Sequence, residues 1–117
     1  MPSVLVVEDD PTVARLVEMT LRFGELEVRA VGSVAEARDL LAEGWDAIVL
    51  DINLPGTSGL ELLRELREDL DVSTPVVMLS GQRHDDEVQR ALAFEGTTYV
   101  TKPFAPEELL EVVQAAV

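Results

Sequence analysis

Residues 48–63 read IVLDINLPGTSGLELL, and this stretch decides the fold class of the chain. Its beginning continues the apolar run Ala47–Leu50, which predicts a buried strand. Residues 53–58 contain proline and glycine and predict a loop. Ser58 followed by Glu61 predicts a capping box at the start of a helix. The apolar stripe of that helix is predicted at Leu60, Leu63, Leu66 and Leu70.

The same change from strand to helix occurs four more times along the chain. Apolar runs at residues 3–7 and 76–79 predict two more buried strands, and the runs at 26–30 and 97–101 predict half-exposed ones. N-cap residues, first-turn acids and helical spacing of apolar side chains predict the intervening helices. Those helices are expected to begin near Asp10-Pro11, Ser33, Asp85 and Pro106, and the first has its apolar residues at Val13, Leu16, Val17, Thr20 and Leu21.

Five strands that alternate with five helices predict a parallel sheet with helices on both faces. The strands near residues 4, 48 and 76 are apolar throughout, so they are expected in the centre, whereas the strands near 28 and 99 carry polar residues and are expected at the edges. This arrangement gives the strand order 2-1-3-4-5 of flavodoxin-like folds. We see no linker or repeat, so the sequence predicts one α/β domain over residues 1–117.

The composition excludes several classes of protein. The chain has nine Lys and Arg and 23 Asp and Glu, which give a net charge of −14. Its hydrophobic residues make up 47% of the sequence, which argues against a disordered chain. Such a charge opposes direct binding to nucleic acid or to an anionic membrane. The absence of cysteine removes disulfides, thiolate metal sites and cysteine nucleophiles. No apolar run reaches the roughly 18 residues of a membrane span, so we expect a cytoplasmic protein.

Polar residues follow the predicted strands at the edge where ligands bind in open α/β sheets. Taken singly, all of these residues except Asp51 favour an ordinary explanation as a cap, a turn or a surface residue, and Asp10 is expected to be a helix cap. Their joint placement at the ends of neighbouring strands favours a site. The predicted set is Glu8 and Asp9 after the first strand, Asp51 after the third, Ser80 after the fourth and Lys102 after the fifth.

Several carboxylates held together repel one another unless a cation neutralises them. Oxygen ligands without cysteine or histidine favour Mg²⁺ or a similar ion such as Mn²⁺. A metal, a lysine and a hydroxyl together form a cradle for phosphoryl oxygens. A carboxylate that remains free in such a cradle can attack phosphorus and form an aspartyl phosphate.

Four motifs, in order, resemble the receiver domain of bacterial two-component response regulators over essentially the whole chain. They are VLVVEDDP at 4–11, IVLDINLPGTSGLELL at 48–63, PVVMLSG at 75–81 and YVTKPF at 99–104. The resemblance implies a signalling phosphoacceptor rather than an enzyme with a separate substrate. It also implies two kinds of partner, namely a sensor histidine kinase or phosphotransfer protein that donates the phosphoryl group, and a downstream effector or fused output domain.

The resemblance assigns the chemistry to particular residues. Asp51 matches the phosphoacceptor, and Lys102 matches the lysine that contacts the phosphoryl group. Glu8 and Asp9 match the acidic pair that binds Mg²⁺, with Asp9 as the direct ligand and Glu8 acting through water. The backbone carbonyl of Asn53 matches the third protein ligand.

The resemblance also implies how a signal leaves the site. Ser80 matches the switch hydroxyl and Tyr99 the aromatic switch, which alter the surface of the fourth helix, fifth strand and fifth helix. The Lys102–Pro103 peptide bond is expected to be cis. The side chains of Asn53 and Gln82 are hypothesised to position a hydrolytic water.

Other functions fit the same residues less well. A haloacid-dehalogenase-like phosphatase needs a second acid two residues after its nucleophile, where this chain has Asn53. A degenerate receiver used only for docking would lack Asp51, the acidic pair or Lys102. A flavin site would need a phosphate-binding loop after the first strand, where acids stand instead.

The chain also departs from the family pattern. Thr97 and Thr98 stand where many relatives have Ala and Asp, and the last helix has no Lys or Arg. Regulators of the winged-helix type commonly dimerise through Asp–Arg pairs on that face, so this dimer mode is not expected here. His84 is expected at the surface, and Trp45 is expected to pack at the entry to the third strand.

Overall fold

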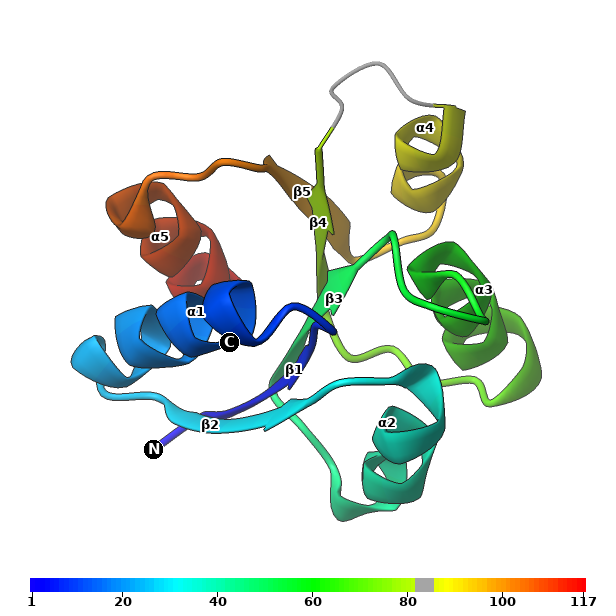
Figure 1. The fold of residues 1–117 in the computed structure, drawn as a ribbon. Helices are drawn as coiled ribbons and strands as arrows, with labels where there is room; N and C mark the ends of the chain where they lie inside the picture. The colour runs from blue at the N-terminus through cyan, green and yellow to red at the C-terminus, as the bar shows by residue number, and fades with distance from the viewer. Residues whose placement is uncertain (82–85) are drawn as a thin grey trace.

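The computed structural model describes residues 1–81 and 86–117. Its five parallel strands lie in the order β2-β1-β3-β4-β5, which confirms the predicted topology (Figure 1). The strands are β1 (Ser3–Val7), β2 (Glu27–Val31), β3 (Ala47–Asp51), β4 (Val76–Ser80) and β5 (Thr97–Thr101). The helices are α1 (Pro11–Phe23), α2 (Val34–Leu40), a 3₁₀ turn η1 (Leu41–Glu43), α3 (Gly59–Arg64), a π-helix η2 (Glu65–Asp69), α4 (Asp86–Leu92) and α5 (Pro106–Ala116).

The sheet separates two apolar clusters. Helices α1 and α5 cover one face, and α2, α3 and α4 cover the other (Figure 1). Every residue of β3 and β4 is buried, whereas β2 and β5 are partly exposed, as the polarity of their sequences predicts. On the α1/α5 face, the buried helix residues are Val17, Leu21, Leu109 and Val113; on the other face they are Val34, Ala37, Leu62, Leu63, Leu66, Val88 and Ala91.

The predicted apolar stripe of the third helix is partly wrong. Leu63 and Leu66 are buried, but Leu70 is 49% exposed, and Leu62 is fully buried although it lay outside the predicted stripe. The exposure of Leu70 follows from the π-helix η2, which continues α3 with more residues in each turn and so rotates the side chains after it away from the expected face. Leu62 lies in α3 before η2, so its burial has a different origin. In α1, Leu16 is likewise exposed, contrary to expectation.

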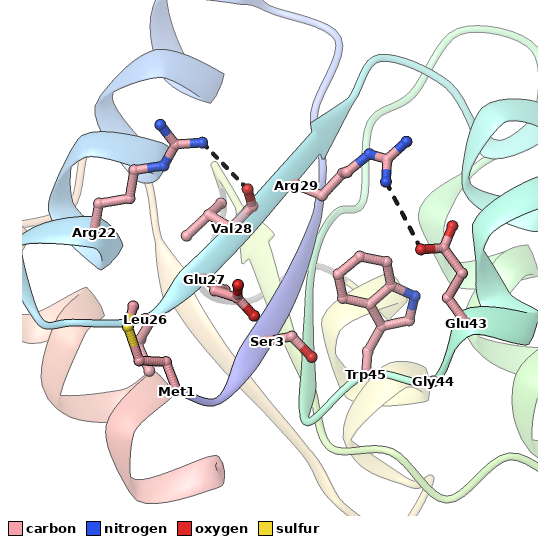
Figure 2. Close-up of a pocket in the computed structure, with 10 residues that line it drawn as sticks. All are labelled: Met1, Ser3, Arg22, Leu26, Glu27, Val28, Arg29, Glu43, Gly44 and Trp45. Carbon is pink, nitrogen blue, oxygen red and sulfur yellow. Dashed lines mark hydrogen bonds and ion pairs between the residues drawn. The ribbon is translucent and has the colours of Figure 1, made fainter.

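Trp45 packs against the α2/α3/α4 cluster, as expected, and its indole N–H donates to the Leu40 carbonyl at 2.8 Å. It lies in a pocket of about 720 Å³ at the amino ends of the strands, opposite the predicted site. Figure 2 shows two arginines there. Arg22 donates a hydrogen bond to the carbonyl of Val28, and Arg29 forms an ion pair with Glu43. Both guanidinium groups therefore bind groups of the domain itself.

Arg67 in η2 joins two loops near the amino ends of β4 and β5. Its guanidinium donates to the backbone carbonyls of Glu95, Val72 and Thr74 at 3.0, 2.7 and 2.8 Å. Burial lowers the pKa of Arg67 below its usual value. The side chain thus fixes the connection from α4 to β5 against the chain that leads into β4.

We predict that Arg67→Lys lowers the free energy of unfolding by about 1–3 kcal/mol, because an ammonium group cannot reach three carbonyls at once. Arg38→Ala is the matched control, since Arg38 of α2 forms a more exposed ion pair with Glu65 of η2, and its loss is expected to be the smaller one. Urea denaturation measures both variants. An equal loss of unfolding free energy in the two variants would contradict the conclusion that Arg67 holds the two loops together.

Candidate functional site

The strand order brings five sequence-predicted residues to one edge of the sheet. Glu8 and Asp9 follow β1, Asp51 ends β3, Ser80 ends β4 and Lys102 follows β5. Parallel strands present their carboxyl ends at the same edge, and here β1 and β3 are hydrogen-bonded neighbours, as are β3 and β4, and β4 and β5.

Three carboxylates form the centre of the site. Glu8, Asp9 and Asp51 each offer an oxygen atom, and these atoms lie within 4.8 Å of one another. Glu8 and Asp51 are only 2% exposed, whereas Asp9 reaches solvent. Such a cluster is unfavourable without compensating positive charge.

Lys102 supplies part of that charge. Its Nζ lies 3.1 Å from Asp51 Oδ2 and 3.2 Å from Glu8 Oε2, so one ammonium group contacts both buried carboxylates. Burial alone would lower the pKa of Lys102, but its contacts with Asp51 and Glu8 hold the pKa above the usual value. The lysine is therefore charged at neutral pH.

The balance of charge remains negative. Burial raises the pKa of Glu8 to about 7, and the hydrogen bond and negative charge of Asp51 act in the same direction against the opposing effect of Lys102. Three acidic side chains thus lie together beside one ammonium group, which contacts two of them. The donor set consists of hard oxygen atoms, so the residues present fit a divalent cation such as Mg²⁺.

Backbone groups fix the carboxylates in place. The N–H of Asn53 donates to Asp51 Oδ1 at 3.1 Å, and the N–H of Asp10 donates to Glu8 Oε1 at 3.3 Å. Asp10 itself caps α1 through bonds from the N–H groups of Thr12 and Val13, as expected. The loop after β1 therefore begins a helix and orients an acid at the same time.

Gly59 is a residue of the site that was not predicted from the sequence. Its N–H donates to the Ile52 carbonyl at 2.9 Å, which places the first turn of α3 directly on the end of β3. A Cβ atom at this position would collide with the carbonyl oxygen of Asp51. A Ser-Gly pair after a proline-containing loop is the only local signal of this close approach.

The predicted switch residues lie beside this centre. Ser80 is buried, and its carbonyl accepts the N–H of Lys102 at 2.7 Å. Tyr99 is partly buried and packs against the cluster that contains Val88 and Ala91 of α4. The Lys102–Pro103 bond is cis, in agreement with the expectation.

Some expectations are left open by the structure. Gln82 and His84 lie outside the described residues. Metal binding by the Asn53 carbonyl stays a prediction, because the described contact of Asn53 is through its N–H. Among the described residues, no helix is long and apolar enough to cross a membrane.

Comparisons of the sequence with known proteins all identify the same family. Residues 4–114 match the model of the response regulator receiver domain. The transcriptional regulatory protein YkoG of Bacillus subtilis, itself uncharacterised, is 39% identical over 114 residues, which cover 97% of this chain and 50% of that protein. The cell cycle response regulator CtrA of Brucella ovis is 38% identical over 115 residues, covering 97% and 49%. The chain thus spans about half the length of these relatives.

Solved structures agree with the sequence relatives. The chemotaxis response regulator CheY4 of Vibrio cholerae superimposes with a TM-score of 0.89 at 29% identity, covering 100% of this chain and 99% of that one. The receiver domain of the Francisella response regulator 1452 gives a TM-score of 0.90 at 30% identity, covering 99% and 96%. The likeness therefore extends over the whole fold.

We predict that Gly59→Ala destabilises the domain by about 1–3 kcal/mol, because the new methyl group must displace the backbone of Asp51. Gly32→Ala is the control, since nothing lies within 4 Å of the point that its new methyl group would occupy, and this change is expected to be near neutral. Thermal or urea unfolding compares the two. Similar stabilities would contradict the close packing of α3 on β3.

We also predict that Mg²⁺ raises the melting temperature by several degrees at saturating concentration, because it binds the folded carboxylate cluster. Glu8→Gln should raise the melting temperature without metal, since it removes one buried acid, and should reduce the shift caused by Mg²⁺. Glu95→Gln removes an exposed acid elsewhere and should leave the shift unchanged. A Mg²⁺ titration by differential scanning fluorimetry would reveal a constant melting temperature if the cluster binds no cation.

Proposed function

The chain belongs to the family of response regulator receiver domains, and we propose that it receives a phosphoryl group on Asp51 from the phosphohistidine of a partner. The observation that supports this most directly is the ammonium group of Lys102 held against Asp51 and Glu8. It provides a positive charge beside the proposed nucleophile, where the negative charge of a phosphoryl group would develop.

The proposed transfer is a single displacement at phosphorus. A carboxylate oxygen of Asp51 forms the new bond to phosphorus while the phosphorus–nitrogen bond of the phosphohistidine breaks, and the electron pair of that bond returns to the imidazole. The N–H of Asn53 holds Asp51 Oδ1 at 3.1 Å, which restrains the carboxylate during the attack. Lys102 then stays with the phosphoryl oxygens.

Glu8, Asp9 and Asp51 are the residues that would hold Mg²⁺ or Mn²⁺, together with the backbone carbonyl of Asn53. When bound, such an ion supplies positive charge beside the phosphoryl oxygens. By resemblance to the family, Asp9 would be the direct ligand and Glu8, which also contacts Lys102, would act through water. We further propose that the amides of Asn53 and Gln82 position the water that hydrolyses the phosphoryl group.

Phosphorylation would be communicated through Ser80 and Tyr99. Ser80 ends β4 next to β3, and Tyr99 packs in the cluster that α4 shares, so a shift of the hydroxyl toward a phosphoryl oxygen opens space for the ring. The change then biases the surface formed by α4, β5 and α5 between two populated states.

We propose that residues 1–117 form one receiver domain that acts in the cytoplasm. A sensor histidine kinase or a phosphotransfer protein would donate the phosphoryl group. An effector or a fused output domain would respond to the phosphorylated state. Of the relatives named above, YkoG and CtrA are about twice as long as the segment that this chain matches. The position of Asn53, two residues after Asp51, disfavours a phosphatase with a separate substrate.

The decisive test uses acetyl phosphate as a small donor. We expect the protein to gain one phosphoryl group in the presence of Mg²⁺, as measured by intact mass, and to gain none after EDTA treatment. Asp51→Asn should abolish the adduct, whereas Asp39→Asn, which changes an exposed acid of α2, should keep it. An unmodified wild-type protein, or an adduct retained in Asp51→Asn, would overturn the assignment of Asp51.

A further inference from the structure

The pocket at the amino ends of the strands lies at the other end of the sheet from Asp51. Ser3 begins β1, Glu27 begins β2 and Trp45 precedes β3, so three neighbouring strands contribute to its lining. Its volume of about 720 Å³ lies in the range of sites that hold small organic molecules. None of the residues proposed for phosphoryl transfer lines it, so its chemistry is separate from that reaction.

The walls of this pocket are held in place by backbone geometry and hydrogen bonds. The N–H of Ser3 donates to the Asp46 carboxylate at 2.8 Å, which ties β1 to the chain that enters β3. Gly44 ends η1 with a φ of 79°, in the left-handed region that favours glycine. The indole N–H of Trp45 is bonded to the Leu40 carbonyl, so the ring has a fixed orientation and presents an apolar surface to the pocket (Figure 2).

The charged groups of the pocket are loosely paired. Figure 2 shows Arg22 and Arg29 at opposite sides of it, and its acids are Glu27 and Glu43. Arg29 Nη1 lies 3.7 Å from Glu43 Oε1, which is longer than a hydrogen bond, and both side chains are more than half exposed. Within residues 1–81 and 86–117, the carboxylate of Glu27 makes no ion pair. Guanidinium donors and carboxylate acceptors are therefore available to a ligand.

Two arginines and two glutamates together select the charge of that ligand. A purely negative molecule would meet both glutamates and the net charge of −14 of the chain, and a purely positive one would meet both arginines. A zwitterion avoids both conflicts. Its carboxylate can accept two hydrogen bonds from a guanidinium group while its ammonium group donates to a glutamate.

We propose that this pocket binds a free α-amino acid with an apolar side chain. The carboxylate and the ammonium group of such a molecule are attached to the same carbon atom, so they fit a neighbouring pair of opposite charges. Arg29 and Glu43 form that pair, and Trp45 and Leu26 supply apolar surface for the side chain of the ligand. Binding is expected to be weak because the two charged groups are exposed to solvent. The inference involves neither Asp51 nor Lys102, so it goes beyond the proposed phosphoryl transfer and does not depend on it.

The fluorescence of Trp45, the only tryptophan of the chain, tests the proposal without Mg²⁺ or a phosphoryl donor. We expect L-phenylalanine to change the emission saturably, with a dissociation constant of about 1 mM. L-Phenylalaninamide lacks the carboxylate and N-acetyl-L-phenylalanine lacks the ammonium group, and each should bind about threefold or more weakly. Equal binding of either analogue, or no saturable change up to about 20 mM L-phenylalanine, would overturn the proposal.

Variants locate the ligand in the pocket. Arg29→Gln and Glu43→Gln should each weaken the binding of L-phenylalanine by about threefold or more, because each removes one of the two charges. Arg29→Gln should not weaken the binding of L-phenylalaninamide any further, since that molecule has no carboxylate. Arg38→Gln is the matched control, because Arg38 of α2 pairs with Glu65 outside the pocket, and it should leave the affinity unchanged. Equal affinities of the wild type and Arg29→Gln for L-phenylalanine would overturn the proposal.

Discussion

The contact of Lys102 with Glu8 and Asp51 is the interaction on which the site depends. Two carboxylates that are only 2% exposed would be unfavourable by themselves, and removing the ammonium group would leave both without a compensating charge. The three residues follow or end β5, β1 and β3, so they meet only when these strands are in register. The charges of the site can therefore compensate one another only in a sheet with this strand order. Gly59 adds a steric requirement, since α3 must lie directly on the carbonyl of Asp51.

The same cluster is left short of positive charge. The pKa of Glu8 rises to about 7 because burial and Asp51 outweigh Lys102, which shows that one lysine does not neutralise the site. A protein selected for stability alone would replace such acids with apolar residues. Their presence is explained if the domain must bind a cation and then a phosphoryl group. The acids Glu8, Asp9 and Asp51 therefore differ in role from the many exposed acids that give the chain its net charge.

The sequence was sufficient for the topology and for the placement of Glu8, Asp9, Asp51, Ser80 and Lys102 at one edge of the sheet, because both follow from periodicity and from strand ends. Apolar runs marked β1, β3 and β4 as central, and the residues directly after them had to share one edge. The π-helix η2 was not predicted, because the apolar spacing of this segment also fits an ordinary α-helix. Its Arg67 donates to three carbonyls outside the helix, and no local pattern reveals such tertiary contacts. The exposure of Leu16 was missed for a related reason: a wide apolar stripe on a helix does not reveal which part of it meets the sheet. The different burial of Glu8 and Asp9 likewise depends on the path of the loop that starts α1.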